Sequence, residues 1–379
     1  MEERALIRFQ APALPPVPEV AAYFAAAEQA HWFSNQGPCV ELLVERLEAY
    51  IGRGLRCAPL ANATSALALA LRALTRADGR RREVVLPSFT FAAAVSAVLW
   101  AGLQPVFVDV EEASWHLCPD ALEAALERDT IAAVLAASTF GSPPPDAIRE
   151  GWETAAAKAG VPVLVDSAAG FGALTGAGER LGGQGTAEVF SFHATKPFAI
   201  GEGGLLVSAN GALVERVARL ANFGFRAGSV DAEVGLNAKL AEWPAATALA
   251  VLDGFEDVLA ARRDAATQLL SAVMAHGYRP QAGTGRPAWQ FVPVLAPSRA
   301  VRDAAIEAAA SDGIELRAYF SVPLHRMPAF RGLPVIGSLA TTERLAGRVL
   351  SLPMANDQTA DHRHRIAAAL ATASSAEAA

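Results

Sequence analysis

The sequence predicts an α/β protein in which helices cover both faces of a mostly parallel sheet. Three observations indicate this fold class. From about residue 40, short runs of β-branched and other apolar residues alternate with longer stretches rich in Ala, Leu and Glu. The apolar runs have no polar face, which is typical of strands buried on both sides. The first two runs also end at a Pro and an Asp, residues that commonly follow a strand.

The expected elements follow one another along the chain. Strands are expected at residues 84–86, 106–108, 132–137, 163–165, 189–192 and 205–207. Helices are expected between them, at residues 66–73, 92–100 and 121–127. Beyond residue 240 the alternation loosens: residues 240–270 have helical composition with an early interruption at Pro244, and residues 289–294 and 314–316 have strand composition. We therefore expect two domains, a large one over residues 1–250 and a smaller α+β one over residues 251–379.

The composition excludes several classes of protein. The chain has 379 residues, with 32 basic and 39 acidic side chains, a net charge of −7 and a hydrophobic content of 52%. So apolar and weakly charged a chain can bury enough surface to offset the entropy lost on ordering, which excludes a disordered protein. Its acidic balance, without a dense run of Lys and Arg, argues against binding to nucleic acid.

The sequence gives no indication of a membrane protein or a secreted one. The most apolar stretch, residues 91–103, is well short of the ~20 residues that cross a bilayer. The first four residues are partly acidic, where a secretory signal would be basic. The three cysteines, Cys39, Cys57 and Cys118, are odd in number and widely spaced, which argues against a disulfide framework and against a zinc site. We therefore expect a cytoplasmic protein without a metal centre.

Ligands of open α/β sheets bind beyond the carboxyl ends of the strands, and polar residues follow two of the expected strands. Asp166 comes directly after residues 163–165 and faces either a ligand or solvent, as a turn-initiating residue would. Lys196 follows residues 189–192 in a weakly charged segment of a chain whose positive charge is nearly all Arg. Burial would lower the pKa of this lysine so that its neutral amine could attack a carbonyl, although a solvated loop lysine is the alternative. His193 alone is more often structural than catalytic.

A third polar cluster opens the helix expected at residues 66–73. Asn62, Thr64 and Ser65 lie where free N–H groups and the helix dipole favour a phosphate, although an ordinary N-cap is the alternative. Residues 201–204, Gly-Glu-Gly-Gly, are weak evidence for a nucleotide loop. Together the three clusters supply what pyridoxal phosphate requires. These are a helix N-terminus for its phosphate, a lysine for its aldehyde and a carboxylate that keeps the ring nitrogen protonated.

Several motifs, in the right order, resemble the DegT/DnrJ/EryC1/StrS family of sugar-nucleotide aminotransferases. The resemblance extends from about Trp32 to Pro353, and its most specific stretch is residues 190–196 with residues 201–204 after it. Further motifs of the family lie at residues 34–38, 86–91, 105–110, 235–242 and 323–325. The resemblance implies the fold of fold type I pyridoxal phosphate enzymes, which is the aspartate aminotransferase-like fold.

The resemblance also implies roles for individual residues. Lys196 would form the Schiff base with the cofactor and act as the catalytic base, and Asp166 would pair with the ring nitrogen. Phe91 would stack on the ring. The phosphate would be held by Thr64, Ser65 and Ser191, and by Asn237 of the neighbouring subunit, which implies a homodimer. The implied substrate residues are Trp32, Asn35, His193, Tyr319 and His325.

Four positions depart from the family pattern. Ala169 stands where the family often has a Gln or His that bonds the ring hydroxyl, and Ala63 precedes Thr64 where a Gly is common. Ser138 begins the segment that is usually His-x-Tyr-Gly, and Lys239 replaces the usual Arg after Asn237. None of these changes removes an essential group.

The resemblance implies transamination of a nucleotide-linked keto-sugar, a dTDP-4-keto-6-deoxyhexose, with L-glutamate as amino donor and pyridoxamine phosphate as intermediate. The alternatives are a C3-keto-sugar or aminocyclitol aminotransferase, a pyridoxal phosphate-dependent sugar dehydratase, and a non-enzymatic regulator that binds the cofactor. A branch of the family that performs dehydration carries His in place of the lysine. The retained Lys196 therefore favours transamination.

Overall fold

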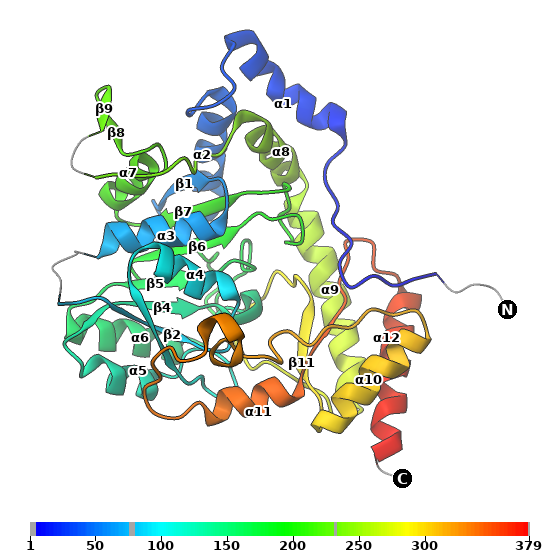
Figure 1. The fold of residues 1–379 in the computed structure, drawn as a ribbon. Coiled ribbons are helices and arrows are strands. Elements are labelled where there is room, and N and C mark those ends of the chain that lie inside the picture. The colour runs from blue at the N-terminus through cyan, green and yellow to red at the C-terminus, as the bar shows by residue number, and fades with distance from the viewer. Residues whose placement is uncertain (1–4, 76–79, 231–232, 378–379) are drawn as a thin grey trace.

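The computed structural model describes residues 5–75, 80–230 and 233–377. Residues 1–4, on which the prediction about a secretory signal rests, lie outside the described residues. Its centre is a seven-stranded sheet with the strand order β1-β7-β6-β5-β4-β2-β3 (Figure 1). The strands are β1 (Arg56–Leu60), β2 (Glu83–Pro87), β3 (Gln104–Val108), β4 (Ile131–Ala137), β5 (Val163–Asp166), β6 (Ala187–Ser191) and β7 (Gly204–Ser208). Neighbours from β3 to β6 pair in parallel, whereas β7 runs antiparallel to both β6 and β1. The predicted mostly parallel sheet is therefore confirmed.

Helices cover both faces of this sheet. One face carries α3 (Ala63–Leu74), α4 (Ala92–Trp100) and α7 (Gly211–Leu220). The other carries α5 (Pro119–Leu126) and α6 (Asp146–Ala159), and beside them α2 (Pro38–Ile51) and α8 (Glu242–Asp253), with α1 (Val17–Ala30) packed outside α8. The short hairpin of β8 (Phe225–Arg226) and β9 (Ser229–Val230) follows α7. Because apolar helix faces lie on both sides, strands such as β2 and β4 are buried at every position.

A second, antiparallel sheet lies beyond α9 (Phe255–Met274). Its strands are β10 (Arg279–Pro280), β11 (Val292–Leu295) and β12 (Val349–Leu352), and α9, α10 (Arg299–Ser311) and α12 (Ala360–Glu377) pack against it. Short 3-10 turns (Thr139–Gly141, Leu324–Arg326 and Pro328–Phe330) and α11 (Ala340–Arg348) complete the described elements. We propose that the boundary near residue 250 separates the two sheets, with Ile7 of the N-terminal segment joining the second core.

Three local predictions were wrong. Pro244 does not interrupt the helix: it is the third residue of α8, where no intrahelical acceptor awaits its nitrogen, and the break lies at Gly254, between α8 and α9. Residues 314–316 form no strand, because Ile314 only makes an isolated bridge to Ile7. The strand expected at residues 289–294 begins only at Val292, since Trp289 has a φ of 57°.

The sequence analysis did not predict the edge strand β1. This strand contains Pro59, and Pro is tolerated only at the edges of sheets, so the residue argues against a strand unless its edge position is known.

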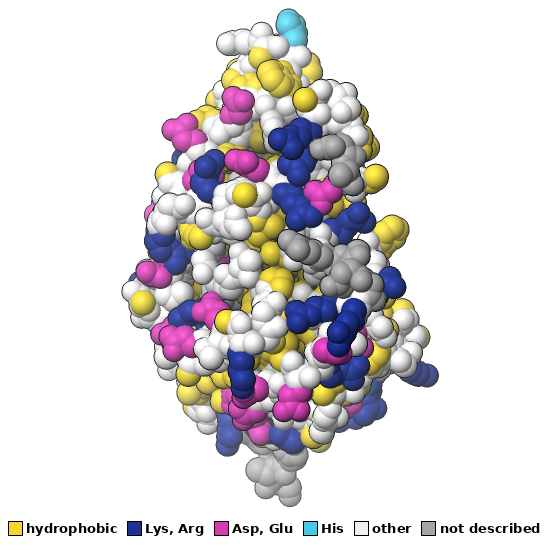
Figure 2. Space-filling model, turned by 90° about the vertical axis from the view of Figure 1, so that its left-hand side faces the viewer, with side chains coloured by type: hydrophobic (Ala, Val, Ile, Leu, Met, Phe, Trp, Pro, Cys, Tyr) yellow, Lys and Arg dark blue, Asp and Glu magenta, His cyan; other side chains and the backbone are white. Residues whose placement is uncertain are grey.

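The surface carries charges of both signs. Figure 2 shows the side of the molecule that lies on the left in Figure 1, with Lys and Arg side chains interspersed among Asp, Glu and hydrophobic ones. Over the described residues of this face no continuous basic stripe of the kind that binds nucleic acid is seen. No helix in the described part of the chain combines the length and the hydropathy needed to cross a membrane.

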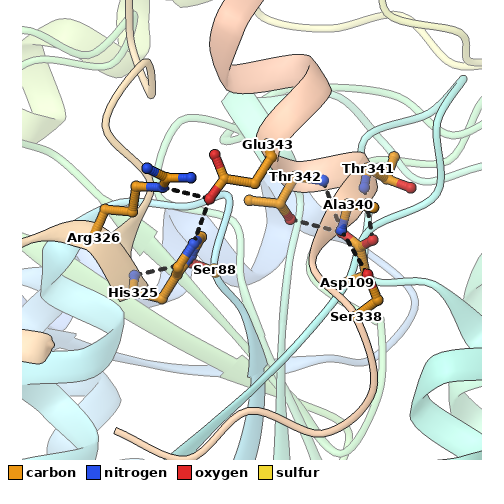
Figure 3. Close-up of polar contacts among 9 residues, drawn as sticks. All are labelled: Ser88, Asp109, His325, Arg326, Ser338, Ala340, Thr341, Thr342 and Glu343. Atoms are coloured by element: carbon orange, nitrogen blue, oxygen red, sulfur yellow. Dashed lines mark hydrogen bonds and ion pairs between the residues drawn. The ribbon is translucent and has the colours of Figure 1, made fainter. Parts of the chain in front are cut away.

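Asp109, which follows β3, caps a distant helix. Its carboxylate accepts hydrogen bonds from the backbone N–H groups of Thr341 and Thr342, both at 2.8 Å, and from the Thr342 hydroxyl (Figure 3). These N–H groups start α11, so they have no acceptor within the helix. Asp109 thus holds the C-terminal segment on the large sheet.

We expect Asp109→Ala to lower the free energy of unfolding by about 1–2 kcal/mol, the usual effect of losing an N-terminal cap. Urea unfolding followed by circular dichroism measures it. Glu150→Ala is the control, because Glu150 is exposed and pairs only on the surface with Arg149, so its effect should stay within about 0.5 kcal/mol. Equal stability of the two variants would contradict the capping role.

Candidate functional site

A cavity of about 890 Å³ opens at the carboxyl ends of the central parallel strands. Ser138, Asp166 and Ser191, which follow or end β4, β5 and β6, all line it. This is the edge of the sheet where the sequence predicts a ligand site. The cavity also contains Thr64, Ser65, Phe91, His193, Lys196 and Tyr319 from the predicted site.

Lys196 presents its amine to this cavity. Its Nζ donates a hydrogen bond to Oε1 of Gln290 at 2.9 Å. Burial lowers the pKa of Lys196 to about 8, and the nearby carboxylate of Asp166 opposes part of that shift. A larger fraction of the amine is therefore neutral, and so nucleophilic, at physiological pH than in an exposed lysine.

Asp166 is a buried carboxyl group at the end of β5. Burial raises its pKa, while the N–H of Ala168, 3.0 Å from Oδ1, and the positive charge of Lys196 lower it. The same two side chains that the sequence paired chemically therefore influence each other electrostatically across one cavity. A buried carboxylate is well suited to hold a protonated ring nitrogen, because the pair is shielded from water.

The lowered pKa of Lys196 leads to a prediction for the protein freed of cofactor. The rate at which added pyridoxal phosphate forms its visible absorption band should rise with pH through a midpoint near 8, because only the neutral amine attacks the aldehyde. A stopped-flow pH profile measures this. Asp166→Asn should move the midpoint to lower pH, since the carboxylate raises the pKa of Lys196. A midpoint near 10.5 in the unsubstituted protein would contradict the prediction.

The N-terminus of α3 also lines the cavity. Asn62 is its N-cap, and its Oδ1 accepts the N–H of Ser65 at 2.8 Å. The Ser65 hydroxyl also donates to the Asn62 carbonyl oxygen, so both donors of Ser65 have partners within the turn. The N–H groups of Ala63 and Thr64 have no intrahelical acceptor, and they and the helix dipole are available to an anion.

Gly204 brings this helix end against the sheet. It begins β7, and a Cβ at this position would lie 2.4 Å from the carbonyl carbon of Asn62 and 2.6 Å from the nitrogen of Ala63. Gly204, the last glycine of the Gly-Glu-Gly-Gly motif, thus allows the helix to pack closely on the sheet. Ser191 pairs with Gly204 across the sheet, and its Oγ accepts the His193 N–H at 3.3 Å, which leaves the Ser191 hydroxyl hydrogen for a ligand.

Aromatic side chains line the rest of the cavity. Phe91, the N-cap residue of α4, is 60% exposed within it and has a free face for a ring. Tyr319 comes from the C-terminal half of the chain and stacks on Phe291, with ring centroids 5.6 Å apart. The neighbouring Phe320 stacks on Phe140 at 4.8 Å, which fixes this segment against the end of β4.

Three predicted residues lie outside the cavity of their own chain. Trp32 and Asn35 are exposed in the turn between α1 and α2, which is anchored where the Gly37 N–H donates to Glu242. Asn237 is also exposed, and its Oδ1 accepts a hydrogen bond from Lys239.

His325 does not line the cavity either. Its Nδ1 lies 2.7 Å from Ser88 Oγ, and its Nε2 lies 2.7 Å from Oε1 of Glu343, which Arg326 also contacts (Figure 3). His325 thus joins the loop after β2 to α11. His193, in contrast, lies at the cavity, where its Nδ1 accepts the N–H of Thr195.

Gln290 and Ser138 are among the cavity residues that sequence reasoning missed. Gln290 was assigned to a strand, whereas it lies before β11 and holds the amine of Lys196. Ser138 was noted only as a departure from a motif, yet it lines the cavity beside Asp166. For Gln290 the sequence offers only a weak signal, a polar residue within an apolar run. For Ser138 the signal is a hydroxyl residue directly after a buried strand.

These groups fit pyridoxal phosphate. The cavity offers unpaired N–H groups at a helix N-terminus for a phosphate, an amine for an aldehyde, a buried carboxylate for a ring nitrogen and an aromatic face for the ring. Among the residues that the structure describes, no group of three or more His, Cys, Asp or Glu side chains could hold a metal ion.

Comparison with known proteins points to the same chemistry. The sequence profile of the DegT/DnrJ/EryC1/StrS aminotransferase family matches residues 17–371. Protein Rv3402c of Mycobacterium tuberculosis is 37% identical over 96% of this chain and 89% of its own length. The UDP-N-acetyl-3-dehydro-alpha-D-glucosamine 3-aminotransferase of Acidithiobacillus ferrooxidans is 32% identical over 88% of this chain and 87% of its own length. The crystal structure of DesI in the presence of its TDP-sugar product superposes with a TM-score of 0.88 and 32% identity. The match covers 98% of this chain and 93% of the DesI chain.

Proposed function

Because this chain belongs to the DegT/DnrJ/EryC1/StrS aminotransferase family, and is therefore a pyridoxal phosphate-dependent aminotransferase, we propose that it aminates a dTDP-4-keto-6-deoxyhexose with L-glutamate as donor. The observation that carries the proposal is the position of Lys196. Its amine has a lowered pKa and lies in one cavity with the buried Asp166 and the free end of α3.

Different residues of the cavity would bind different parts of the cofactor. Pyridoxal phosphate supplies an aldehyde that condenses with amines and a cationic ring that stabilises negative charge on the adjacent carbon. The N–H groups of Ala63 and Thr64 and the Ser191 hydroxyl would hold its phosphate, and Phe91 would lie against its ring. The Asp166 carboxylate would keep the ring nitrogen protonated, because that pairing lowers the energy of the charged form.

Lys196 also moves the proton in the proposed reaction. Its neutral Nζ would take the proton from the α-carbon of the amino donor as a general base, and later deliver a proton as a general acid. Gln290 Oε1 accepts a hydrogen bond from Nζ and would hold the amine at the cavity. A pKa near 8 suits both the removal and the delivery of a proton, since the amine is neither fully charged nor fully neutral around neutral pH.

The size and charge of the cavity support a nucleotide-linked substrate. About 890 Å³ is at the large end of the range for ligand sites, and room for both a cofactor and a sugar is needed. Arg72 adds a positive charge to the lining, and both the diphosphate of a nucleotide sugar and the carboxylates of glutamate are anionic. The structure of DesI was determined in the presence of its TDP-sugar product, which supports the dTDP form. The Acidithiobacillus enzyme is named for a UDP-linked 3-keto-sugar, which supports C3 amination as the second candidate.

We also propose that the protein works as a cytoplasmic homodimer. Trp32 and Phe33 are about half exposed, and Phe223, Leu236 and Trp243 are exposed nearly as much. Large apolar side chains of this kind are typical of subunit interfaces. A second copy packed over these side chains would bring Asn237, Trp32 and Asn35 toward a cavity. The three free cysteines agree with a reducing compartment.

Product analysis tests the proposed reaction. The holoenzyme is incubated with L-glutamate and a panel of dTDP- and UDP-linked 3-keto and 4-keto sugars, and products are identified by mass spectrometry and NMR. We expect an amino sugar with nitrogen at C4 from the dTDP-4-keto-6-deoxyhexose. Nitrogen at C3 would establish the second candidate, and a deoxysugar without nitrogen would instead indicate dehydration.

A further inference from the structure

Glu188 is a carboxyl group in the middle of the large sheet that the proposed mechanism does not use. It lies on β6 between Val165 of β5 and Val207 of β7, and it is fully buried. Its Oε2 accepts the N–H groups of Gly182 and Gln184, at 2.6 and 3.2 Å, and its Oε1 contacts the hydroxyl of Ser167. Each of these partners is neutral.

A chain of two hydroxyls connects this carboxyl group to the cavity. Ser167 Oγ, in contact with Glu188, lies 2.8 Å from Ser138 Oγ, and both serines are buried. Ser138 lines the cavity, and its backbone N–H donates to the carbonyl oxygen of Asp166 at 2.9 Å. The relay of Glu188, Ser167 and Ser138 therefore ends beside the residue proposed to hold the cofactor ring.

The charge of Glu188 fixes the direction of every hydrogen bond in this relay. A carboxylate can only accept, so Ser167 donates to Glu188, and Ser138 in turn donates to Ser167. Ser138 then faces the cavity with its oxygen lone pairs. A proton on Glu188 would reside on Oε1, because Oε2 already accepts two N–H groups, and it would reverse both bonds. Ser138 would then turn its hydroxyl hydrogen toward the cavity.

We propose that Glu188 is a positioning residue that acts through Ser167 to set which end of the Ser138 hydroxyl dipole faces the bound cofactor. The inference rests on the proposed placement of pyridoxal phosphate against Asp166 in this cavity. With Glu188 ionised, the negative end of the dipole faces a cationic ring and favours the protonated form of the cofactor.

The surroundings of Glu188 allow both of its charge states. Burial raises the pKa of Glu188 to about 7, and this value already includes the opposing effects of the Ser167 hydroxyl, the N–H groups of Gln184 and Gly182, and the charge of Arg53. Arg53 is the charged group that acts on Glu188 from outside the sheet, and its own guanidinium bonds to Glu179. The neighbours across the sheet, Val165 and Val207, are apolar.

Glu188→Gln tests the relay, because the amide has only one arrangement that satisfies the site. Its oxygen must accept the N–H groups of Gly182 and Gln184, so its NH₂ faces Ser167 and forces the reversed direction. We expect the pH midpoint of the visible absorption of the bound cofactor to fall by about 0.5–1 unit, the effect of one hydrogen bond. Ser167→Ala cuts the relay while it keeps the carboxyl group of Glu188, from which it removes one hydrogen-bond partner, and it should also shift the midpoint.

Two comparisons separate the relay from a structural effect. In a Ser138→Ala background, Glu188→Gln should produce no further shift, because the end of the relay is missing. Glu83→Gln is the matched control: Glu83 is a buried strand glutamate bound to Arg128 and Thr130, outside the cavity lining, and its replacement should leave the midpoint unchanged. An equal shift with and without Ser138, or no shift in either relay variant, would overturn the proposal. A failure of the unsubstituted protein to develop any cofactor band would instead refute the proposed site itself.

Discussion

Lys196→Ala is expected to fold normally yet lose transamination by about 10⁴-fold or more, because among the described residues no other lysine lines the cavity to take the proton from the donor carbon. Lys158 and Lys239 are the remaining lysines of the chain, and neither lines the cavity. The rate is measured as amino-sugar formation from glutamate and a keto-sugar nucleotide. Borohydride treatment of the holoenzyme should attach the cofactor to Lys196, and peptide mapping should find no attachment in the variant.

Lys158→Ala is the matched control for this experiment. Lys158 is an exposed lysine of α6 that pairs with Glu123 on the surface, so its loss should leave both turnover and borohydride labelling unchanged. Far-ultraviolet circular dichroism establishes that both variants are folded. Appreciable transamination by Lys196→Ala, or labelling of another lysine, would contradict the assigned role.

Asp166→Asn is expected to reduce the turnover number by about 10²–10⁴-fold while changing the affinity for substrate much less. The amide keeps the shape of the side chain but carries no charge, so it no longer holds a proton on the ring nitrogen. The ring then withdraws less charge from the reacting carbon. Steady-state kinetics gives the split between turnover and affinity, and cofactor content is determined by absorbance.

Asp109→Asn provides the comparison, because Asp109 also follows a parallel strand but lies outside the cavity. Its replacement weakens the cap of α11 and should lower stability, with the turnover of the folded enzyme retained. If Asp166→Asn kept turnover within about tenfold of the unsubstituted enzyme, the role of Asp166 would be refuted.

Much of the fold was predictable because its strands are buried on both faces. Continuous apolar runs such as residues 84–86 and 132–137 were recognised as strands for that reason, and the helices between them were located by composition. The errors fell where local sequence and tertiary contacts disagree. Pro244 would interrupt the middle of a helix, but it lies in the first turn of α8. Residues 314–316 resemble a strand, but in the part of the chain that the structure describes they bridge only to the N-terminal segment.

The chemistry of the site was also present in the sequence. A lone lysine after a buried strand, an aspartate after its neighbour and hydroxyl residues opening a helix are local features, and each side chain can be identified without coordinates. Because parallel strands end at one edge of a sheet, the order of these elements was enough to predict that Asp166 and Lys196 share a cavity.

Only the tertiary structure decided which polar groups already have partners. Burial lowers the pKa of Lys196, and Gln290 bonds to the Lys196 amine from a segment 94 residues away in the chain. The two serine hydroxyls between Glu188 and the cavity come from the ends of different strands. His325, which the resemblance implies as a substrate residue, bonds to Ser88 and Glu343 in the fold and does not line the cavity, so its role in substrate binding stays a prediction. Desolvation and hydrogen bonding depend on atoms that are close in space and distant in the chain, and no local pattern of residue types specifies them.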